Sequence, residues 1–253
     1  MERTIFEKSN HIGILTLNKP PFNIFDGSFY REIKAAFEKI NEMDDIFVVI
    51  INSMFKHFSG GGDLKEIQSV TEENAAYIMQ AVADCMTAVY TCKKPTIAAV
   101  NGRAVGAGTA FAASCDIIIA SENARFSLPE ISVGFIGAAE FLELLIPRKA
   151  ARYYTYTGKE IPKNKLLAWG GIHAVVPDGK LMDEAVKVAE ELMESAPYAL
   201  SCFKEVMNIN DDEKLAEKYM RGCSYFIRNS MTEDFKECHH ALKDKRKPLY
   251  KGD

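Results

Sequence analysis

The chain contains 253 residues, of which 47% are hydrophobic and 26% charged, and its formal net charge is −4. These values are ordinary for a soluble protein of one large domain, alone or with a smaller appendage, and the acidic balance argues against nucleic acid as the main partner. No apolar run approaches the ~20 residues of a membrane span, and the N-terminus lacks the apolar core of a signal peptide, so we expect a cytoplasmic protein with no membrane partner.

Strand and helix patterns alternate through the first two thirds of the chain. Segment 11–17, HIGILTL, alternates as a half-buried strand does, whereas segment 47–52, FVVIIN, is apolar throughout and predicts a strand buried on both faces. Apolar residues at helical spacing predict helices among the strands. The predicted strands are 3–8, 11–17, 47–52, 96–101 and 116–121, and the predicted helices are 28–43, 69–92 and 106–114.

From Pro147 onward the pattern is mainly helical, interrupted by a short strand at 172–176. The helices predicted for this last part are 180–195, 198–208, 212–229 and 232–245. An alternation of strands and helices followed by helices alone predicts an α/β core with a helical C-terminal part.

The six cysteines form no recognisable metal or disulfide framework. No two of them are spaced as CxxC, and no cysteine–histidine spacing suits zinc. Because several lie in apolar stretches, we expect reduced and mostly buried thiols, and no metal. His239 and His240 lie in a polar helical stretch, where a solvated surface is the expected role.

Two glycine-rich turns and a following glutamate are the most informative feature. The first turn is HFSGGGDLKEI (57–67), the second is AAVNGRAVGAGTAFAASCDIIIAS (98–121), and Glu130 follows in FSLPEISVG (126–134). Neither turn is a Walker A or GxGxxG motif. Taken alone, each has the simpler interpretation of a tight turn in an α/β protein. Together they offer two backbone N–H donors for an oxyanion and one carboxylate for moving a proton, the minimum equipment for a thioester enolate.

The series of motifs resembles the crotonase (enoyl-CoA hydratase/isomerase) family. FSGGGDLKEI and KPTIAAVNGRAVGAGTAFAASCDIIIASENARFSLPEISVG carry the resemblance, and LNKPPFNIF (17–25), TGKEI (157–161) and EDFKECHHALKDKRKPLYKG (233–252) extend it over nearly the whole chain. It implies an α/β crotonase-like superhelix of ββα units with a C-terminal helical trimerisation region. We expect residues 1–195 to form the core with the acyl-CoA site and residues 196–253 to form the helical region.

The resemblance also implies roles for individual residues. The N–H groups of Gly62 and Ala107 correspond to the two donors of the family's oxyanion hole, with Ala107 at a helix N-terminus whose dipole favours negative charge. Glu130 corresponds to the catalytic acid/base in the family's PE motif.

Further residues correspond to the family's CoA site. Lys56 and Lys65 match positions that contact the CoA phosphates, and Phe22 and Ile24 match the path of the adenine and pantetheine. Lys245, within the sequence KRK, matches a basic cluster that reaches the CoA of a neighbouring subunit. For each lysine singly, a solvated surface charge is the alternative.

Two positions depart from the family pattern. Family hydratases carry a second glutamate where this chain has Ala110, and alanine can neither activate water nor protonate carbon. The loop after Gly134 is shorter than usual and contains Glu140, near where some relatives place a second acid. A catalytic Glu140 and a carboxylate that merely favours a helix N-terminus are equally open.

These observations predict an acyl-CoA enzyme with enoyl-CoA isomerase or hydratase-like activity. A single base suits isomerisation, because one carboxylate can move a proton from one carbon to another. A CoA-thioester hydrolase or decarboxylase is the first alternative, and a non-catalytic acyl-CoA-binding protein is the second. The resemblance implies no cofactor, since CoA is part of the substrate, and a homotrimer or dimer of trimers.

Overall fold

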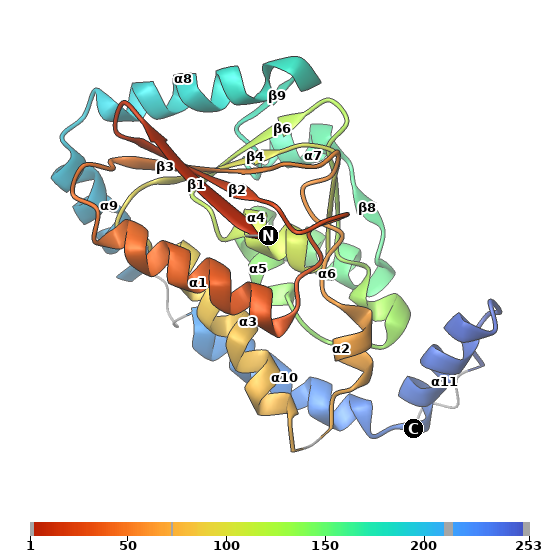
Figure 1. Cartoon of the computed structure of the whole chain (residues 1–253). Helices are drawn as coiled ribbons and strands as arrows, with labels where there is room; N and C mark the ends of the chain where they lie inside the picture. The colour runs from red at the N-terminus through yellow and green to blue at the C-terminus, as the bar shows by residue number, and fades with distance from the viewer. Residues whose placement is uncertain (1–2, 72, 210–214, 250–253) are drawn as a thin grey trace.

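A six-stranded sheet in the order β1-β2-β3-β4-β6-β9 forms the centre of the fold (Figure 1). The computed structural model describes residues 3–71, 73–209 and 215–249. β1 pairs antiparallel with β2, and each further pair in this sheet is parallel. The strands are β1 (Thr4–Ser9), β2 (Ile12–Leu17), β3 (Val48–Ser53), β4 (Thr96–Val100), β6 (Ile117–Ser121) and β9 (Ala174–Val176).

Helices cover both faces of this sheet, as the fully apolar strand at 47–52 predicts. Val49 and Ile51 of β3 point into the larger core, together with buried residues of α1 (Gly27–Asn41) and α3 (Ala75–Tyr90). Val48 and Ile50 point into a second core, which α8 (Leu181–Met193) closes. β3 is therefore buried on its two sides, and the β-branched residues valine and isoleucine fill its buried positions.

A second, three-stranded sheet positions the glycine-rich turns. Its order is β5-β7-β8, with β5 parallel to β7 and β8 antiparallel to it. This sheet is absent from the sequence prediction, because its strands are too short to show an alternating pattern. The elements are β5 (Arg103–Val105), α4 (Ala107–Ala113), β7 (Arg125–Ser127), the 3-10 helix η1 (Pro129–Val133) and β8 (Glu160–Ile161).

The prediction of one helix over 69–92 is wrong at its N-terminal end. A separate helix, α2 (Leu64–Gln68), stands first, and the Ser69 hydroxyl donates back to the Glu66 carbonyl, which ends α2 rather than starting a new helix. Thr71 and Asn74 then bond each other reciprocally, side chain to backbone, before α3 begins. The side chains of Ser, Thr and Asn thus satisfy backbone groups that a continuous helix would have paired.

The remaining helices complete the C-terminal half. They are α5 (Ala139–Leu145), α6 (Arg148–Thr157), α7 (Lys163–Ala168), the 3-10 helix η2 (Asp178–Lys180), α9 (Pro197–Ile209), α10 (Leu215–Ser230) and α11 (Glu233–Lys243). A partly buried ion pair ties this tail to the core: the buried Lys204 ammonium on α9 lies 2.7 Å from the carboxylate of Asp116, just before β6. Thr96 also donates to Asp116 from its amide and its hydroxyl.

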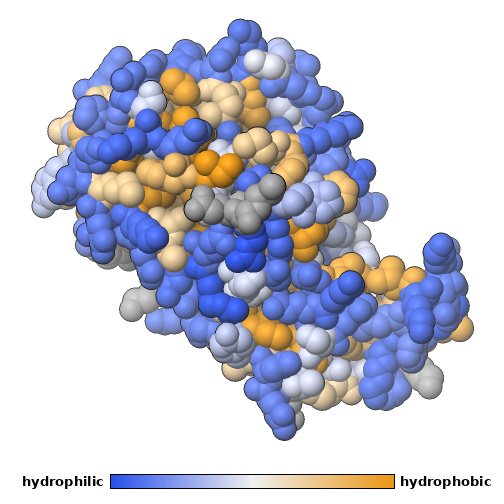
Figure 2. All heavy atoms as spheres, viewed as in Figure 1, coloured by the Kyte–Doolittle hydropathy of each residue, from blue (hydrophilic) through white to orange (hydrophobic). Residues whose placement is uncertain are grey.

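Hydrophilic residues cover most of the face seen in Figure 2, and a band of hydrophobic residues crosses the upper part of this face. Within the described part of the chain, none of the helices has both the length and the apolar character needed to cross a bilayer.

Candidate active site

The two glycine-rich turns lie against each other, although the 30 residues 68–97 separate them in the sequence. Backbone hydrogen bonds join them: Ser59 N–H donates to the Arg103 carbonyl, and Val105 N–H donates to the Ser59 carbonyl. Gly61 has φ +94°, and a side-chain carbon there would lie 2.7 Å from the Val105 carbonyl oxygen and 3.8 Å from the Ala107 nitrogen. Only glycine permits this approach, which brings the turns within a few ångströms.

Both predicted oxyanion donors are free. Phe25 pairs with Gly62 as a parallel bridge, in which Phe25 N–H donates to the Gly61 carbonyl and Asp63 N–H donates to the Phe25 carbonyl. This bridge uses the groups on either side of Gly62 but leaves its own N–H unused. Ala107 is the first residue of α4, so its N–H has no acceptor within the helix. Within the described residues, neither N–H donates to a protein group.

Glu130 lies directly over the start of α4. Gly106 has φ +53°, and a side-chain carbon there would overlap Oε1 of Glu130 and lie 3.1 Å from the carboxyl carbon. Oε2 of Glu130 is buried and has no hydrogen-bond partner among the described residues. Burial therefore raises the pKa of Glu130 to about 8. A carboxyl whose pKa lies near neutrality can both accept and return a proton at physiological pH.

A cavity of about 50 Å³ unites these groups. Gly62, Ala107, Ala110 and Glu130 all line it, so the structure brings together three of the four predicted catalytic residues. Five aromatic side chains contribute to its walls: Phe25, Tyr30, Phe135, Phe141 and Tyr219. This is the arrangement that general acid–base chemistry on a small, mostly apolar group requires: two free donors, one buried carboxyl and a largely dry wall.

Comparison with known proteins agrees with this geometry. The sequence model described as Enoyl-CoA hydratase/isomerase matches residues 7–253. The chain belongs to this family, which is the crotonase family. A carnitinyl-CoA dehydratase of Salmonella enteritidis is 31% identical over 246 residues, which cover 94% of each chain.

Solved crotonase-family structures share the fold along the whole chain. An enoyl-CoA hydratase/isomerase from Pseudoalteromonas atlantica has a TM-score of 0.87 at 26% identity and covers 99% of this chain and 100% of its own. A carnitinyl-CoA hydratase from Mycobacterium avium has a TM-score of 0.85 at 29% identity, and the alignment covers 100% of both chains. The crotonase-like fold predicted from the sequence is thereby confirmed.

Glu140, the fourth predicted catalytic residue, lies outside the cavity that contains Glu130. It stands in the first turn of α5 and faces α10, where a side-chain carbon on Gly222 would be 2.6 Å from its Oε1. Burial raises the pKa of Glu140 as well, and its Oε2 has no partner among the described residues. The structure therefore does not bring Glu140 together with Glu130.

Glu66 is a carboxylate of the cavity that the sequence analysis missed. It lines the cavity from α2, and both of its oxygens accept from the Gly27 amide, at 3.1 Å and 2.9 Å. Burial raises its pKa, against the lowering effect of that hydrogen bond. It follows the first glycine-rich turn in the sequence DLKE, and its place in the first turn of a helix that Asp63 caps was the available signal.

The predicted CoA residues lie around the outer side of the first turn. Phe22 is 49% exposed and stacks loosely on His57, with ring centroids 6.2 Å apart, and Ile24 packs against Gly60. Lys56 and Lys65 are exposed. Lys245 is exposed beyond α11, a helix that contacts α2 through the Gln68–His239 hydrogen bond. Within the described residues, no hydrogen bond or ion pair joins Lys245 to Lys56 or Lys65, so the structure does not bring the three lysines together.

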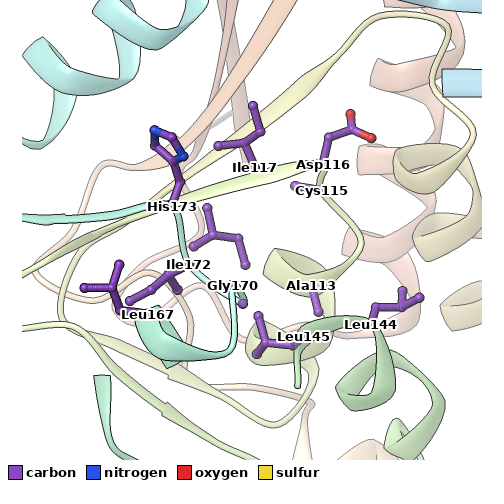
Figure 3. Close-up of a pocket in the computed structure, with 12 residues that line it drawn as sticks. Ala113, Cys115, Asp116, Ile117, Leu144, Leu145, Leu167, Gly170, Ile172 and His173 are labelled. Atoms are coloured by element: carbon purple, nitrogen blue, oxygen red, sulfur yellow. The ribbon is translucent and has the colours of Figure 1, made fainter. Parts of the chain in front are cut away.

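A larger cavity of about 360 Å³ lies elsewhere, between β6, α5 and α7 (Figure 3). Leu144, Leu145 and Leu167 form part of its wall, and Figure 3 shows the Asp116 carboxylate directed away from them. Thr96 and Lys204 already engage that carboxylate. This cavity contains neither oxyanion donors nor Glu130, so its size does not make it the catalytic site.

The raised pKa of Glu130 predicts a stability that falls with pH. Between its ordinary value of 4.5 and about 8, the folded protein binds more protons at this site than the unfolded chain does. The contribution of Glu130 to the free energy of unfolding is complete below pH 4.5 and is lost as the pH rises toward about 8. Over this range the free energy of unfolding falls by up to about 1.4 kcal/mol per pH unit. Glu130→Gln removes this dependence, so urea unfolding should show the variant gaining stability over the parent from about pH 5 to pH 8.

The matched control is Glu191→Gln, which replaces an exposed carboxylate on α8 and should show no such gain. A Glu130→Gln variant whose stability keeps a constant difference from the parent across this range would contradict the burial of an uncompensated carboxyl.

Proposed function

We propose that this protein acts on an acyl-CoA thioester through an enolate, in an enoyl-CoA isomerase or hydratase-like reaction. The observation that carries the proposal is the position of Glu130, buried over the start of α4 beside the free Ala107 N–H and in one cavity with Gly62. A thioester oxygen held by these two N–H groups would carry the negative charge of the enolate. Loss of the α-proton to Glu130 then becomes feasible near neutral pH.

Isomerisation of a double bond and hydration or dehydration differ in whether they need a second polar group. Ala110 lines the cavity, so the carboxylate of two-glutamate hydratases is missing at the place where it would act. One carboxyl suffices for a double-bond shift, because Glu130 can take a proton from one carbon and return it to another. The dehydratase and hydratase names of the relatives favour removal or addition of water.

The charge of the cavity disfavours the decarboxylase alternative. Asp63, Glu66 and Glu130 line it, and within the described residues no lysine, arginine or histidine does. An acyl group with its own carboxylate would enter beside acidic side chains and would find no cation to pair with, which is unfavourable in a poorly solvated site. A neutral or cationic acyl group would not be repelled by these carboxylates.

The alternative of a passive acyl-CoA-binding protein leaves Glu130 unexplained. An apolar or hydrogen-bonded side chain would serve binding equally well, whereas a buried carboxyl without a partner costs folding free energy. Such a cost is expected where the group performs chemistry. We further propose that no cofactor takes part beyond the CoA of the substrate, with Phe22, Ile24, Lys56, Lys65 and Lys245 in contact with it.

Product analysis by mass spectrometry tests the proposal. The substrates are crotonyl-CoA, a 3-enoyl-CoA, a 3-hydroxyacyl-CoA and malonyl-CoA. Hydration, dehydration or a double-bond shift supports it, whereas release of free CoA or carbon dioxide as the principal reaction would establish the hydrolase or decarboxylase alternative.

The first expected result concerns turnover. Glu130→Gln keeps the shape of the side chain and removes the base, so kcat should fall about 10²–10⁴-fold. In the parent, kcat/KM for α-proton removal should rise with pH up to about 8, since this ratio reports the pKa of the free enzyme. The measurement is steady-state kinetics. A fall in kcat of less than about tenfold would place the chemistry on another group.

The second expected result concerns the oxyanion donor at Gly62. A first side-chain carbon there meets only Ile67 Cδ1, at 3.4 Å, so the fold has room for the start of a side chain. Gly62→Val should therefore remain folded but keep the thioester oxygen away from the N–H, with a loss of about 10²–10³-fold in kcat. Gly179→Val is the control, because nothing lies within 4 Å of its side-chain position. Full activity of Gly62→Val would remove this N–H from the mechanism.

The third expected result concerns self-association, which we propose to be a homotrimer or dimer of trimers. α9 presents Phe203, Val206 and Met207 to the outside, with exposures of 70%, 54% and 71%, while its Lys204 is anchored in the core. Large apolar groups so exposed commonly mark a surface that another subunit covers. Phe203→Asp should lower the sedimentation coefficient to that of a monomer, and Lys187→Glu on α8 should leave it unchanged. A monomeric parent protein would contradict the proposal.

A further inference from the structure

Tyr30, a buried residue, lines the same cavity as Glu130. It belongs to α1, far from both glycine-rich turns in the sequence, and its residue exposure is only 4%. Its ring packs on Phe25, with centroids 5.1 Å apart and an interplanar angle of 36°. Packing on a fully buried aromatic ring holds the phenol in place.

The hydroxyl of Tyr30 has no hydrogen-bond partner within the described residues. Tyr219, the other tyrosine of the cavity, differs because its hydroxyl lies 3.6 Å from the sulfur of Met79. Tyr30 is not among the described residues whose fully buried polar atoms lack a partner, so its hydroxyl reaches the open space of the cavity. A hydroxyl that lines a cavity without a protein partner is available to an oxygen that arrives with the ligand.

The phenol remains a donor over the whole physiological range. Burial first, and then the neighbouring Cys85 and Glu66, raise the pKa of Tyr30 well above its ordinary value of 10, and Glu130 adds to the effect. A group that keeps its proton can donate a hydrogen bond to an oxygen of the substrate without becoming charged.

The other polar groups of the cavity are engaged. Asp63 accepts from the amides of Lys65 and Glu66 at the start of α2, and Glu66 accepts from the Gly27 amide. Ala110 has no polar atom in its side chain. Tyr30 is therefore the neutral donor that the cavity offers beside the oxyanion N–H groups and the Glu130 carboxyl.

We propose that Tyr30 is a further catalytic residue, which donates a hydrogen bond to the oxygen on the β-carbon of a 3-hydroxyacyl-CoA. This inference rests on the proposed enolate function and narrows its substrate class to the 3-hydroxyacyl-CoA and 2-enoyl-CoA pair. In family hydratases, the second glutamate at the position of Ala110 would hold this oxygen. Here Tyr30 would take over that role.

The dehydration step balances with one carboxyl. The Glu130 carboxylate takes the α-proton, and the electron pair of the C–H bond forms the enolate, whose negative charge lies on the thioester oxygen. This pair then returns to form the double bond between the α- and β-carbons as the β-carbon–oxygen bond breaks. The proton on Glu130 passes to the departing hydroxyl, which leaves as water, and Glu130 is a carboxylate again. Tyr30 keeps its proton throughout and orients the departing oxygen.

Tyr30→Phe tests the proposal, because it removes one oxygen and keeps the ring. Dehydration of 3-hydroxybutyryl-CoA should slow by about ten- to a hundredfold, the effect of losing one hydrogen bond to the reacting oxygen. Exchange of the α-protons of butyryl-CoA with D₂O, followed by NMR, should change less than about twofold, since that substrate has no β-oxygen. Tyr77→Phe, on the exposed side of α3, is the control for both assays.

A stability measurement separates this role from a structural one. Removing a hydroxyl that makes no hydrogen bond to the protein should leave the melting temperature unchanged or raise it, whereas removing a hydroxyl that holds the fold together should lower it. Equal loss of exchange and dehydration, or dehydration within twofold of the parent, would overturn the role of Tyr30. Failure of the proposed function itself would look different: α-proton exchange would then persist in Glu130→Gln.

Discussion

Burial of the Glu130 carboxyl against the start of α4 is the constraint on which the rest of the site depends. The contact exists only because Gly106 has no side chain and takes a positive φ, and it places the carboxyl beside the first free N–H of the helix. Oε2 has no hydrogen bond among the described residues, and burial raises the pKa to about 8. Burial with one oxygen unpaired costs folding free energy, and the raised pKa that results makes Glu130 suitable for exchanging a proton near neutral pH.

The oxyanion donors need a different kind of support, because backbone N–H groups must be left unpaired at a defined place. Two short parallel bridges, Phe25 with Gly62 and Ser59 with Ala104, provide it. They fix the chain on either side of the first turn while Gly62 N–H stays free. The backbone groups on either side of Gly62 have hydrogen bonds of their own. The folding free energy lost to unpaired donors is therefore limited to the two N–H groups that a substrate oxygen would pair.

Much of the core could be predicted from the sequence, because its signals are local. The apolar run at 47–52 needs no partner to indicate a strand buried on both faces, and the helical stripes of α1 and α8 indicate which side packs. The small sheet of β5, β7 and β8 left no such signal, since two or three residues cannot show a period. The start of α3 was misplaced because hydrogen bonds between Thr71 and Asn74 compete with helix formation.

For the site, the sequence by itself determined the glycine-rich turns, the small residues at Gly62 and Ala107, and the carboxyl type at Glu130. These are requirements of backbone conformation and of chemistry, and each is present in a short segment. Only the tertiary structure decided which other polar groups share the cavity. It turns Tyr30 of α1 and Glu66 of α2 toward Glu130, and it turns Glu140 of α5 toward Gly222. The orientation of a helix depends on packing between distant segments, and a pKa depends on burial, so neither can be read from neighbouring residues in the chain.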